Sequence, residues 1–359
     1  MSISYKKFKW KEAPSSLLMP ICAILFALLV SSVLIVIMGL DLKVAYAALL
    51  KGAFGGRAAI GETLTKMIPL MFTALSYALA KRCGMINLGA EGQLYMGGLC
   101  AALVALNLQV PAIIHIPLCM VAGFIGGGLW GMLAGALKLK FGASEMITTI
   151  MLNYIAQYFV NFCVDSVVRE PGGVLPQSAK MATTAQLPRI ISGTRVHLGI
   201  VFAIVFVILY YIFLWRTRQG FETRVVGLNP EAARYAGFNG KARSLSAMFM
   251  AGGVAGMAGL CEVLGIQLRV YKNFSPSYGF DGIATALLGR NTPIGIVLSS
   301  GLFGALRSGS NQMQIDAGVP AAMVNVIQAL VILFVIGSAY FTTLTKKLAI
   351  KRAAKEDKA

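Results

Sequence analysis

The chain has 359 residues, of which 57% are hydrophobic and only 13% are charged. A soluble globular domain carries roughly 25% charged residues and displays them on its surface. The composition therefore excludes a soluble protein and predicts an all-α, polytopic membrane protein. The net charge of +18 does not indicate a nucleic-acid partner, because Lys and Arg lie in short segments between the apolar runs, where they orient membrane helices.

Membrane-spanning helices are predicted wherever roughly 20 mostly apolar residues follow one another. Uncharged runs of this kind occupy residues 17–40, 92–109, 111–137, 146–164, 197–215, 244–261 and 319–343. A shorter run at 67–80 is also expected to span, and 44–59 is expected to be an interfacial or re-entrant piece. Glycine recurs every four residues at Gly123, Gly127, Gly131 and Gly135, which predicts a face on which another helix packs closely.

The stretch at 281–306 predicts a broken helix. Residues 281–288 are too few to span as an ordinary helix, and 289–293 separate them from an apolar run that ends at Leu306. Discontinuous helices are typical of transport pathways. Counting the short piece gives about ten crossings, with both termini on the cytoplasmic side by the positive-inside rule.

The predicted organisation is a cytoplasmic tail at 1–16, a transmembrane domain at 17–343 and a basic cytoplasmic tail at 344–359. Within the transmembrane domain, 169–195 is expected to be an extended outer loop, because Pro and Gly recur in it. The segment 216–243 is expected to be a basic cytoplasmic loop. The cysteines lie singly in or beside apolar runs and predict neither a disulfide framework nor a metal site.

The loop at 216–243 contains a short helix whose two ends are marked by the sequence. Asn229 is a favoured N-cap, Pro230 suits the first helical position, and Glu231 suits the positive end of the helix dipole. Gly237 can take the left-handed conformation that ends a helix. A delimited helix of about two turns favours a docking element for a soluble partner; a surface helix on the lipid headgroups is the alternative.

Polar side chains between and within the predicted spans are candidates for a translocation path. The candidates are Asn87, Glu91, Gln93, Asn153, Gln157 and Asn311. Polar groups at membrane depth usually face a bundle interior or a water path, although 84–94 is also compatible with a plain turn. Asn153, Gln157 and Asn161 share one helix face, where they line a pathway or bond neighbouring helices. Amides suit an uncharged, hydrogen-bonding solute better than an ion.

Motifs for catalysis are missing from the sequence. It has no GxxxxGK[ST] phosphate loop for ATP hydrolysis and no cluster of ligands with metal spacing, so neither a cofactor nor a metal is predicted. No nucleophile and base pair supports an intramembrane enzyme. An ion-coupled secondary transporter is a further alternative, but the predicted spans lack the carboxylate relay of proton-coupled transport.

Three segments resemble the simple-sugar, nucleoside and branched-chain amino-acid permease family of ABC importers. The stretch 84–93, GMINLGAEGQ, is similar to the family signature, and 227–239 resembles the coupling loop. The stretch 280–290, FDGIATALLGR, resembles the late half-helix motif. The NLGAEGQ wording, together with 176–178 and 187–188 in the outer loop, is most similar to the nucleoside-importer branch.

The resemblance implies the type II importer fold in a bacterial plasma membrane. The implied partners are ABC ATPase subunits inside, a solute-binding lipoprotein outside, and a second permease subunit of different sequence. The residues implied to couple to the ATPase are Asn229, Pro230, Glu231, Ala232, Ala233, Arg234, Tyr235 and Gly237. The implied solute is a nucleoside; a simple sugar such as ribose and a branched-chain amino acid are alternatives within the family.

Overall fold

The computed structural model describes residues 13–320 and, after these, residues 323, 325–327, 329, 330, 333, 334 and 337. The expected tails at 1–16 and 344–359 and the expected last span at 319–343 therefore lie wholly or largely outside the described residues. The chain divides into two compact units, Met1–Gly52 with Gly309–Ala359, and Ala53–Ser308. The described residues form helices, isolated bridges and loops, and no strand.

The smaller unit contains α1 (Ala13–Ile37) and most of α2 (Leu42–Phe54). Asp41 starts α2, because its carboxylate accepts hydrogen bonds from the backbone N–H groups of Lys43 and Val44 at 2.8 and 3.2 Å. The hydroxyl of Tyr46 donates to the carbonyl of Leu28 at 2.6 Å and so fastens α2 to α1. Most of the stretch expected to be interfacial or re-entrant is thus a regular helix.

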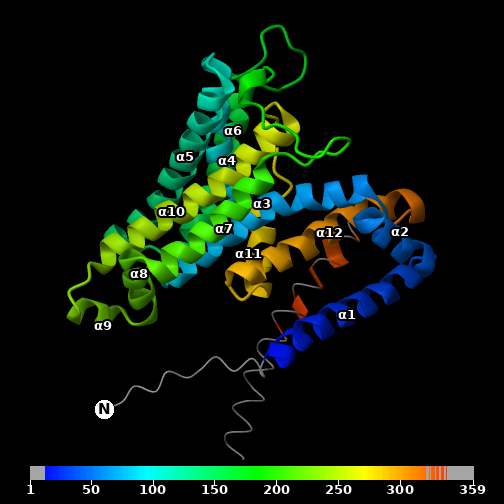
Figure 1. Cartoon of the computed structure of the whole chain (residues 1–359), viewed down its shortest axis with the longest axis horizontal. Helices are drawn as coiled ribbons and strands as arrows, with labels where there is room; N and C mark the ends of the chain where they lie inside the picture. Colours follow the sequence, from blue (N-terminus) through cyan, green and yellow to red (C-terminus); the bar gives the residue numbers. More distant parts are fainter. Residues whose placement is uncertain are drawn as a thin grey trace, which may run out of the picture. The chain divides into compact units, whose positions relative to one another are not determined.

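The larger unit is a helical bundle (Figure 1). Its helices are α3 (Arg57–Arg82), α4 (Ala90–Asn107), α5 (Ala112–Phe141), α6 (Glu145–Asp165), α7 (Gly199–Arg216), α8 (Arg218–Leu228), α9 (Pro230–Tyr235), α10 (Gly240–Cys261), α11 (Tyr278–Leu288) and the first part of α12 (Pro293–Ala317). A 3-10 turn (Thr183–Ala185) and a π-helix (Glu262–Gln267) complete it. The helices α8 and α9 lie at one end of the bundle and the loop 169–195 at the other.

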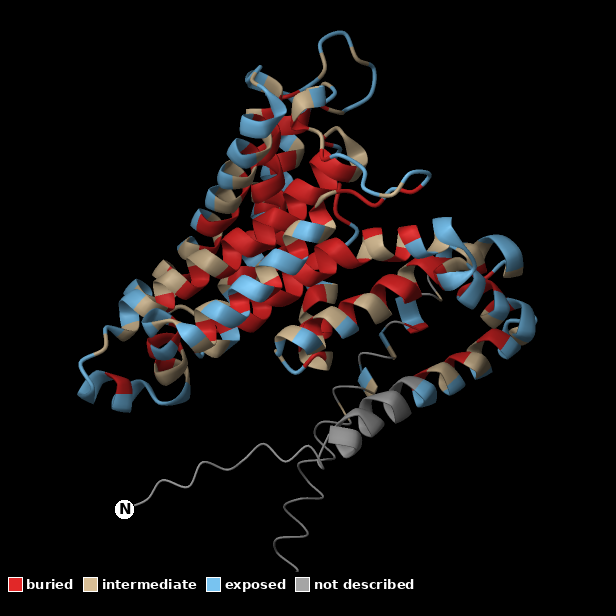
Figure 2. Ribbon diagram, in the orientation of Figure 1, coloured by how far each residue is buried: buried red, intermediate tan, exposed pale blue. Residues whose placement is uncertain are grey.

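Five of the described helices are long and apolar enough to cross a membrane: α3, α5, α6, α7 and Gly240–Gln267. The predicted total of about ten crossings is not confirmed. The apolar windows of α3 and Gly240–Gln267 are 89% and 83% buried, whereas those of α5, α6 and α7 are at most 39% buried (Figure 2). The helices α3 and α10 therefore lie in the core, whereas the exposed side chains of the other three are largely apolar, as is typical of a surface in contact with lipid.

The predicted glycine face of α5 packs against α10. A Cβ atom on Gly256 would overlap the carbonyl oxygen of Gly123, and one on Gly252 would overlap the carbonyl oxygen of Gly127. The two backbones therefore approach more closely than any side chain permits. Close backbone approach is how helices associate where water supplies no driving force, so the packing prediction is confirmed.

The broken helix is also confirmed, with wider bounds. The first piece begins at Tyr278 rather than 281, and the second extends to Ala317. Between them Arg290 and Asn291 adopt positive φ values of 52°. Their N–H groups donate to the carbonyls of Leu287 and Ala286 at 3.0 and 2.8 Å, which is the hydrogen-bond pattern that ends a helix in a left-handed turn.

The loop 169–195 is extended and structured, as predicted, with a 3-10 turn and isolated bridges. It is fastened to the chain that follows the π-helix. Arg269 pairs with Glu170 at 2.6 Å, and Ser178 exchanges backbone and side-chain hydrogen bonds with Val270 at 3.0 and 2.9 Å. The hydrogen bond from Arg269 lowers the pKa of the Glu170 carboxyl below its ordinary value, so the carboxylate stays ionised to a lower pH than that of an unpaired glutamate.

Candidate functional site

The short helix α9 has the caps that its sequence predicts. The side-chain oxygen of Asn229 accepts hydrogen bonds from the N–H groups of Glu231 and Ala232 at 3.1 and 3.0 Å, and Pro230 occupies the first helical position. At the other end Gly237 has a φ of 77°. The N–H groups of Gly237 and of the residue after it donate to carbonyls of the last turn, both at 3.0 Å. Local chemistry alone therefore defines this helix.

The outer face of α9 is open. Tyr235 is 94% exposed, and Leu228, the last residue of α8, is 87% exposed. Glu231, Ala232 and Arg234 are exposed as well. Ala233 is the exception: it is 1% exposed and packs inward. An apolar and aromatic surface of this kind at a helix end favours contact with another protein, and Ala233 supports the helix rather than contributing to its outer face.

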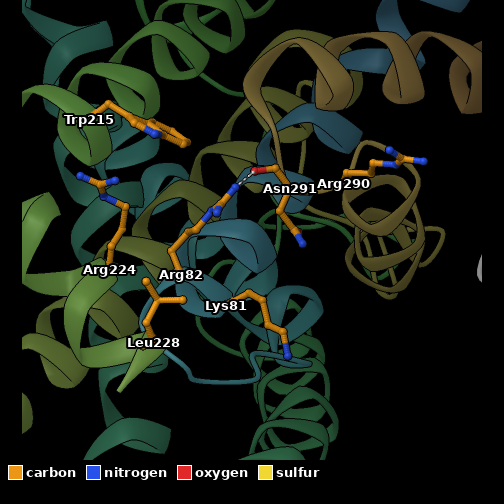
Figure 3. Close-up of a pocket in the computed structure, with 8 residues that line it drawn as sticks. Lys81, Arg82, Trp215, Arg224, Leu228, Arg290 and Asn291 are labelled. Carbon is orange, nitrogen blue, oxygen red and sulfur yellow. Dashed lines mark hydrogen bonds between the residues drawn. The ribbon is translucent and has the colours of Figure 1, made fainter. Parts of the chain in front are cut away.

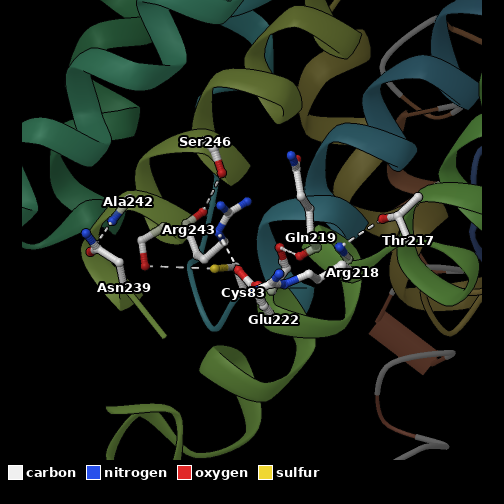
Figure 4. A network of polar contacts seen from close by, with 12 residues as sticks. Cys83, Thr217, Arg218, Gln219, Glu222, Asn239, Ala242, Arg243 and Ser246 are labelled. Carbon is white, nitrogen blue, oxygen red and sulfur yellow. Dashed lines mark hydrogen bonds and ion pairs between the residues drawn. The ribbon is translucent and has the colours of Figure 1, made fainter. Parts of the chain in front are cut away.

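The segment before α9 is a helix that the sequence analysis missed. Thr217 caps α8 by accepting from the N–H of Gly220 at 3.1 Å. Glu222 then pairs with Arg218 one turn back and with Arg243 on α10, both at 3.0 Å (Figure 4). A Thr cap followed by an i,i+4 ion pair is a helix signal in the sequence. The ion pairs hold α8 on the long central helix.

The end of α3 joins α8 to the broken helix. A Cβ atom on Gly227 of α8 would overlap the carbonyl of Arg82, which shows how closely α8 passes α3. The guanidinium of Arg82 donates to the carbonyl of Asn291 at 3.1 Å, and the hydroxyl of Tyr210 donates to the same carbonyl at 3.0 Å (Figure 3). The last turn of α3 therefore contacts α8 on one side and the α11–α12 break on the other.

Asn87 and Gln93 form a buried reciprocal amide pair. Each donates its NH₂ group to the other's oxygen at 2.9 Å, and Asn87 also bonds Ser76 at 3.1 Å and the N–H of Gly89 at 3.0 Å. Both amides are at most 1% exposed. The pair fixes the turn between α3 and α4 in the core of the bundle. A reciprocal pair of this kind stabilises the turn whether or not it also faces the solute.

Replacing Gln93 with methionine removes this pairing at nearly constant volume. We expect the substitution to lower the free energy of unfolding by about 1–3 kcal/mol, because Asn87 keeps buried groups without their partner. Thermal denaturation of the purified permease measures the change. Gln157→Met, at a half-exposed amide that bonds Asn273 at 2.8 Å, should cost less; an equal loss would contradict the account.

The three amides that share a face of α6 bond neighbouring segments. Asn153 accepts from the N–H of Gly92 and donates to the carbonyl of Leu88, both at 2.8 Å. Gln157 and Asn161 both donate to the side chain of Asn273, at 2.8 and 2.9 Å. Asn153 thus bonds α4, whereas Gln157 and Asn161 bond a residue of the loop after the π-helix; a path along the three stays a prediction. Asn311 is exposed on α12 in the smaller unit, and its role in a path stays a prediction.

Two motifs far apart in the sequence meet at Glu91. Its carboxylate accepts from the backbone N–H of Gly279 at 2.6 Å, so the start of α4 contacts the start of α11. A Cβ atom on Gly279 would overlap the backbone of Glu91, and one on Gly282 would overlap Thr73 of α3. The short helix α11 is therefore seated on α3 and α4 by two glycines that allow close approach.

A charged group beside this contact was not predicted as a site. Asp281 on α11 pairs with Arg307 on α12 at 2.8 Å, and the guanidinium lies 4.6 Å from the ring centre of Tyr278. Arg307 also donates to the carbonyl of Pro276 at 2.6 Å. Its position directly after an apolar run was the available signal. The pair binds the two pieces of the broken helix together, so that they can move as one element.

The described residues contain no group of three His, Cys, Asp or Glu side chains that could hold a metal ion. The arrangement instead joins an exposed helix, α9, to the buried polar contacts of α4 and α11 through α8 and the end of α3. Such a set of packed helices can transmit a displacement.

Comparison with known proteins also indicates a transport protein. Residues 59–336 match the family model described as the branched-chain amino acid transport system permease component. The chain is 36% identical to the guanosine ABC transporter permease protein of Bacillus subtilis, over 94% of this chain and 98% of that protein. It is 34% identical to the nucleoside ABC transporter permease protein of Lactococcus lactis subsp. cremoris, over 89% and 90% of the two chains.

A sugar transporter is similar to the same degree. The glucose ABC transporter permease protein of Haloferax volcanii is 34% identical, over 93% of this chain and 90% of that protein. The family model and these matches extend over most of the chain, including α3 to α12. This multi-pass membrane protein therefore belongs to the branched-chain amino acid transport system permease component family, as a permease subunit of an ABC transporter.

Proposed function

We propose that this chain is the permease subunit through which an ABC importer moves nucleosides across a bacterial plasma membrane. The proposed complex contains ABC ATPase subunits, a second permease chain of different sequence and a solute-binding lipoprotein. In this arrangement the end of the bundle with α8 and α9 faces the cytoplasm, as do both termini, and the loop 169–195 faces outward.

The capped, exposed helix α9 is the observation that carries the coupling role. A connecting segment has no need of a helix closed by Asn229 and Gly237, with Tyr235 extended into solvent at its end. A rigid helix that projects from the bundle presents a fixed shape to an ATPase. Residues 229–232, 234 and 235 and Gly237 are therefore proposed to dock on that partner, while the buried Ala233 supports the helix from its inner side.

The contacts of α9 suggest how ATP-driven movement reaches the path. Displacement of α9 would pull α8, and α8 is joined to α10 through Glu222 and Arg243. The close contact of Gly227 with Arg82 would carry the same movement to α3 and, through Asn291, to the α11–α12 break. Glu91 then follows α11, because it holds the N–H of Gly279. These packed contacts would let closure of the ATPases open a gate at α4 and α11.

Two observations support a neutral, hydrogen-bonding solute. Two relatives with names that specify nucleoside or guanosine transport extend over nearly the whole chain. The polar side chains near the α4–α11 contact include the amides of Asn87 and Gln93, and Asp281 there is paired with Arg307. A sugar is the second candidate, since the glucose transporter of Haloferax volcanii is similar to almost the same extent.

Uptake measurements test the substrate. Cells with and without this gene should be given radiolabelled guanosine, uridine, glucose, ribose and leucine. We expect the gene to be required for nucleoside uptake alone, and the uptake to persist when an uncoupler collapses the ion gradient, provided ATP is maintained. Loss of glucose or ribose uptake with normal nucleoside uptake would show that the solute is a sugar. Abolition of uptake by the uncoupler would show that transport is coupled to an ion gradient and is not driven by ATP.

A further inference from the structure

A basic pocket of about 270 Å³ opens at the end of the bundle where α3, α7, α8 and the α11–α12 break meet (Figure 3). Its cationic lining residues are Lys81, Arg82, Arg224 and Arg290, and none of the eight residues that line it is acidic. Arg82 and Arg224 both lie near the ring of Trp215, whereas Arg290 points away from them. Several cations around one small cavity favour an anion.

The side chains of Arg82 and Arg224 each have an N–H donor without a hydrogen-bond partner among the described residues. The guanidinium carbons of Arg82 and Arg224 lie 5.3 and 5.9 Å from the Trp215 ring centre. Over the part of the chain that the structure describes, the Nε atoms of both side chains are buried and have no hydrogen-bond partner. Buried donors without a partner are uncommon in folded proteins. Both side chains are half-buried, and an anionic oxygen in the pocket would bond the accessible part of their guanidinium groups.

The position of the pocket places it at the level of lipid headgroups. Lys81 and Arg82 end the apolar helix α3, and Trp215 stands near the end of α7. The outer face of α7 is apolar and exposed, at residues that include Ile204 and Ile208. Trp is enriched where a membrane meets water, and basic pockets between membrane helices bind anionic headgroups.

An apolar groove of about 320 Å³ is lined by α3 and α7, which also line the basic pocket. Leu75 and Leu79 line the groove and Arg82 lines the pocket. Since these three residues follow at intervals of four and three along α3, they share one helix face. Tyr210 lines the groove, and its hydroxyl bonds the carbonyl of Asn291 in the pocket wall. An apolar groove that leads along one helix face to a cationic pocket matches the two parts of a phospholipid.

We propose that this paired pocket and groove bind one anionic phospholipid, with its phosphate beside Arg82 and Arg224 and one acyl chain along the exposed groove residues Leu209 and Ile212. A free phosphate would use the pocket without the groove, so the lipid accounts for both. The proposal concerns a lipid site and goes beyond solute transport. Because the pocket lies where α8 contacts α3, a lipid bound there would also strengthen the junction between the exposed end and the bundle.

Quenching of Trp215 fluorescence tests the proposal directly. In the full chain, Trp10→Phe and Trp130→Phe leave Trp215 as the single tryptophan. The protein is reconstituted into phosphatidylcholine vesicles that contain brominated phosphatidylglycerol or, separately, brominated phosphatidylcholine. We expect quenching to saturate at roughly tenfold lower mole fractions of the anionic lipid, since each basic side chain near a membrane surface contributes about fivefold to anionic lipid binding.

The variant Arg82→Gln/Arg224→Gln should reduce this preference by on the order of tenfold. Lys81→Gln/Arg224→Gln provides a second test that leaves the Arg82 contacts with Asn291 in place. Lys140→Gln is the matched control, because Lys140 is exposed at the end of α5 outside the pocket, and it should keep the preference.

Three results would overturn the proposal. Equal quenching by the two brominated lipids would show that no anionic lipid is selected. Relief of the quenching by millimolar inorganic phosphate would show a site for a free anion. Unchanged lipid preference in both double variants, with loss of ATPase subunits on purification of the complex, would show that the pocket contacts a protein.

Discussion

Replacing Tyr235 with aspartate is expected to abolish solute uptake while leaving the permease folded in the membrane. The side chain is 94% exposed, so the substitution removes no contact within the described chain. At a protein interface, loss of an aromatic anchor costs about 2 kcal/mol or more, which corresponds to at least ~30-fold in affinity. We expect the ATPase subunits to be lost during purification and uptake to fall to background.

Val174→Asp is the matched control for this experiment. Val174 is 92% exposed and lies in the loop at the opposite end of the bundle, so the same charge is added far from α9. Co-purification of the ATPase should be unchanged. Normal uptake by the Tyr235→Asp variant would contradict the coupling role of α9. Ala233 is less suitable for this test, because a bulky residue there would disrupt the buried side of the helix.

Gly256→Leu is expected to prevent assembly of the bundle. The two backbones at this position are so close that even a Cβ atom would overlap the carbonyl oxygen of Gly123. A flexible side chain could move aside, but a helix backbone cannot do so without separating α5 from α10. Overpacking in a well-packed interior costs roughly 1–3 kcal/mol per substitution, and sometimes more, so we expect Gly256→Ala to be destabilised and Gly256→Leu to be degraded or aggregated.

Gly301→Ala on α12 is expected not to destabilise the protein. A Cβ atom there would meet only the sulfur of Met67 at 3.8 Å, which is ordinary contact. Since alanine favours a helix over glycine by about 1 kcal/mol, this variant should melt at the same temperature as the parent or slightly higher. Thermal unfolding of the detergent-solubilised proteins compares the two alanine variants. Equal melting temperatures would show that the α5–α10 contact is looser than described.

The sequence by itself determined the elements that depend on neighbouring residues. Asn229, Pro230 and Gly237 define α9, because a cap requires only the side chain and the backbone next to it. The break after α11 and the glycine face of α5 were predicted for the same reason, since a run of residues fixes them. The composition excluded a soluble protein, because too few charged residues exist to cover a surface. The family resemblance also rested on short stretches of sequence.

The sequence missed α8, although its Thr217 cap and the Arg218–Glu222 pair were readable. The low mean hydropathy of this basic segment led to its description as a loop. The sequence-based prediction also placed Ala233 with the docking residues, because a helix of six residues has too little periodicity to show which side is buried. Neither error concerns the class of protein. The first concerns whether a basic segment is helical, and the second concerns which face of a short helix is buried.

Only the tertiary structure decided which polar groups meet. Asn87 precedes α4 and Gln93 lies in its first turn, and the bond from Asn87 to Ser76 depends on how α3 packs against this pair. Glu91 and Gly279 lie 188 residues apart and come together because α11 is seated on α4. The basic pocket likewise draws Arg82, Trp215 and Arg224 from three helices. Local sequence fixes helices and their ends, whereas contacts between distant segments depend on how the helices pack, which no short stretch of sequence contains.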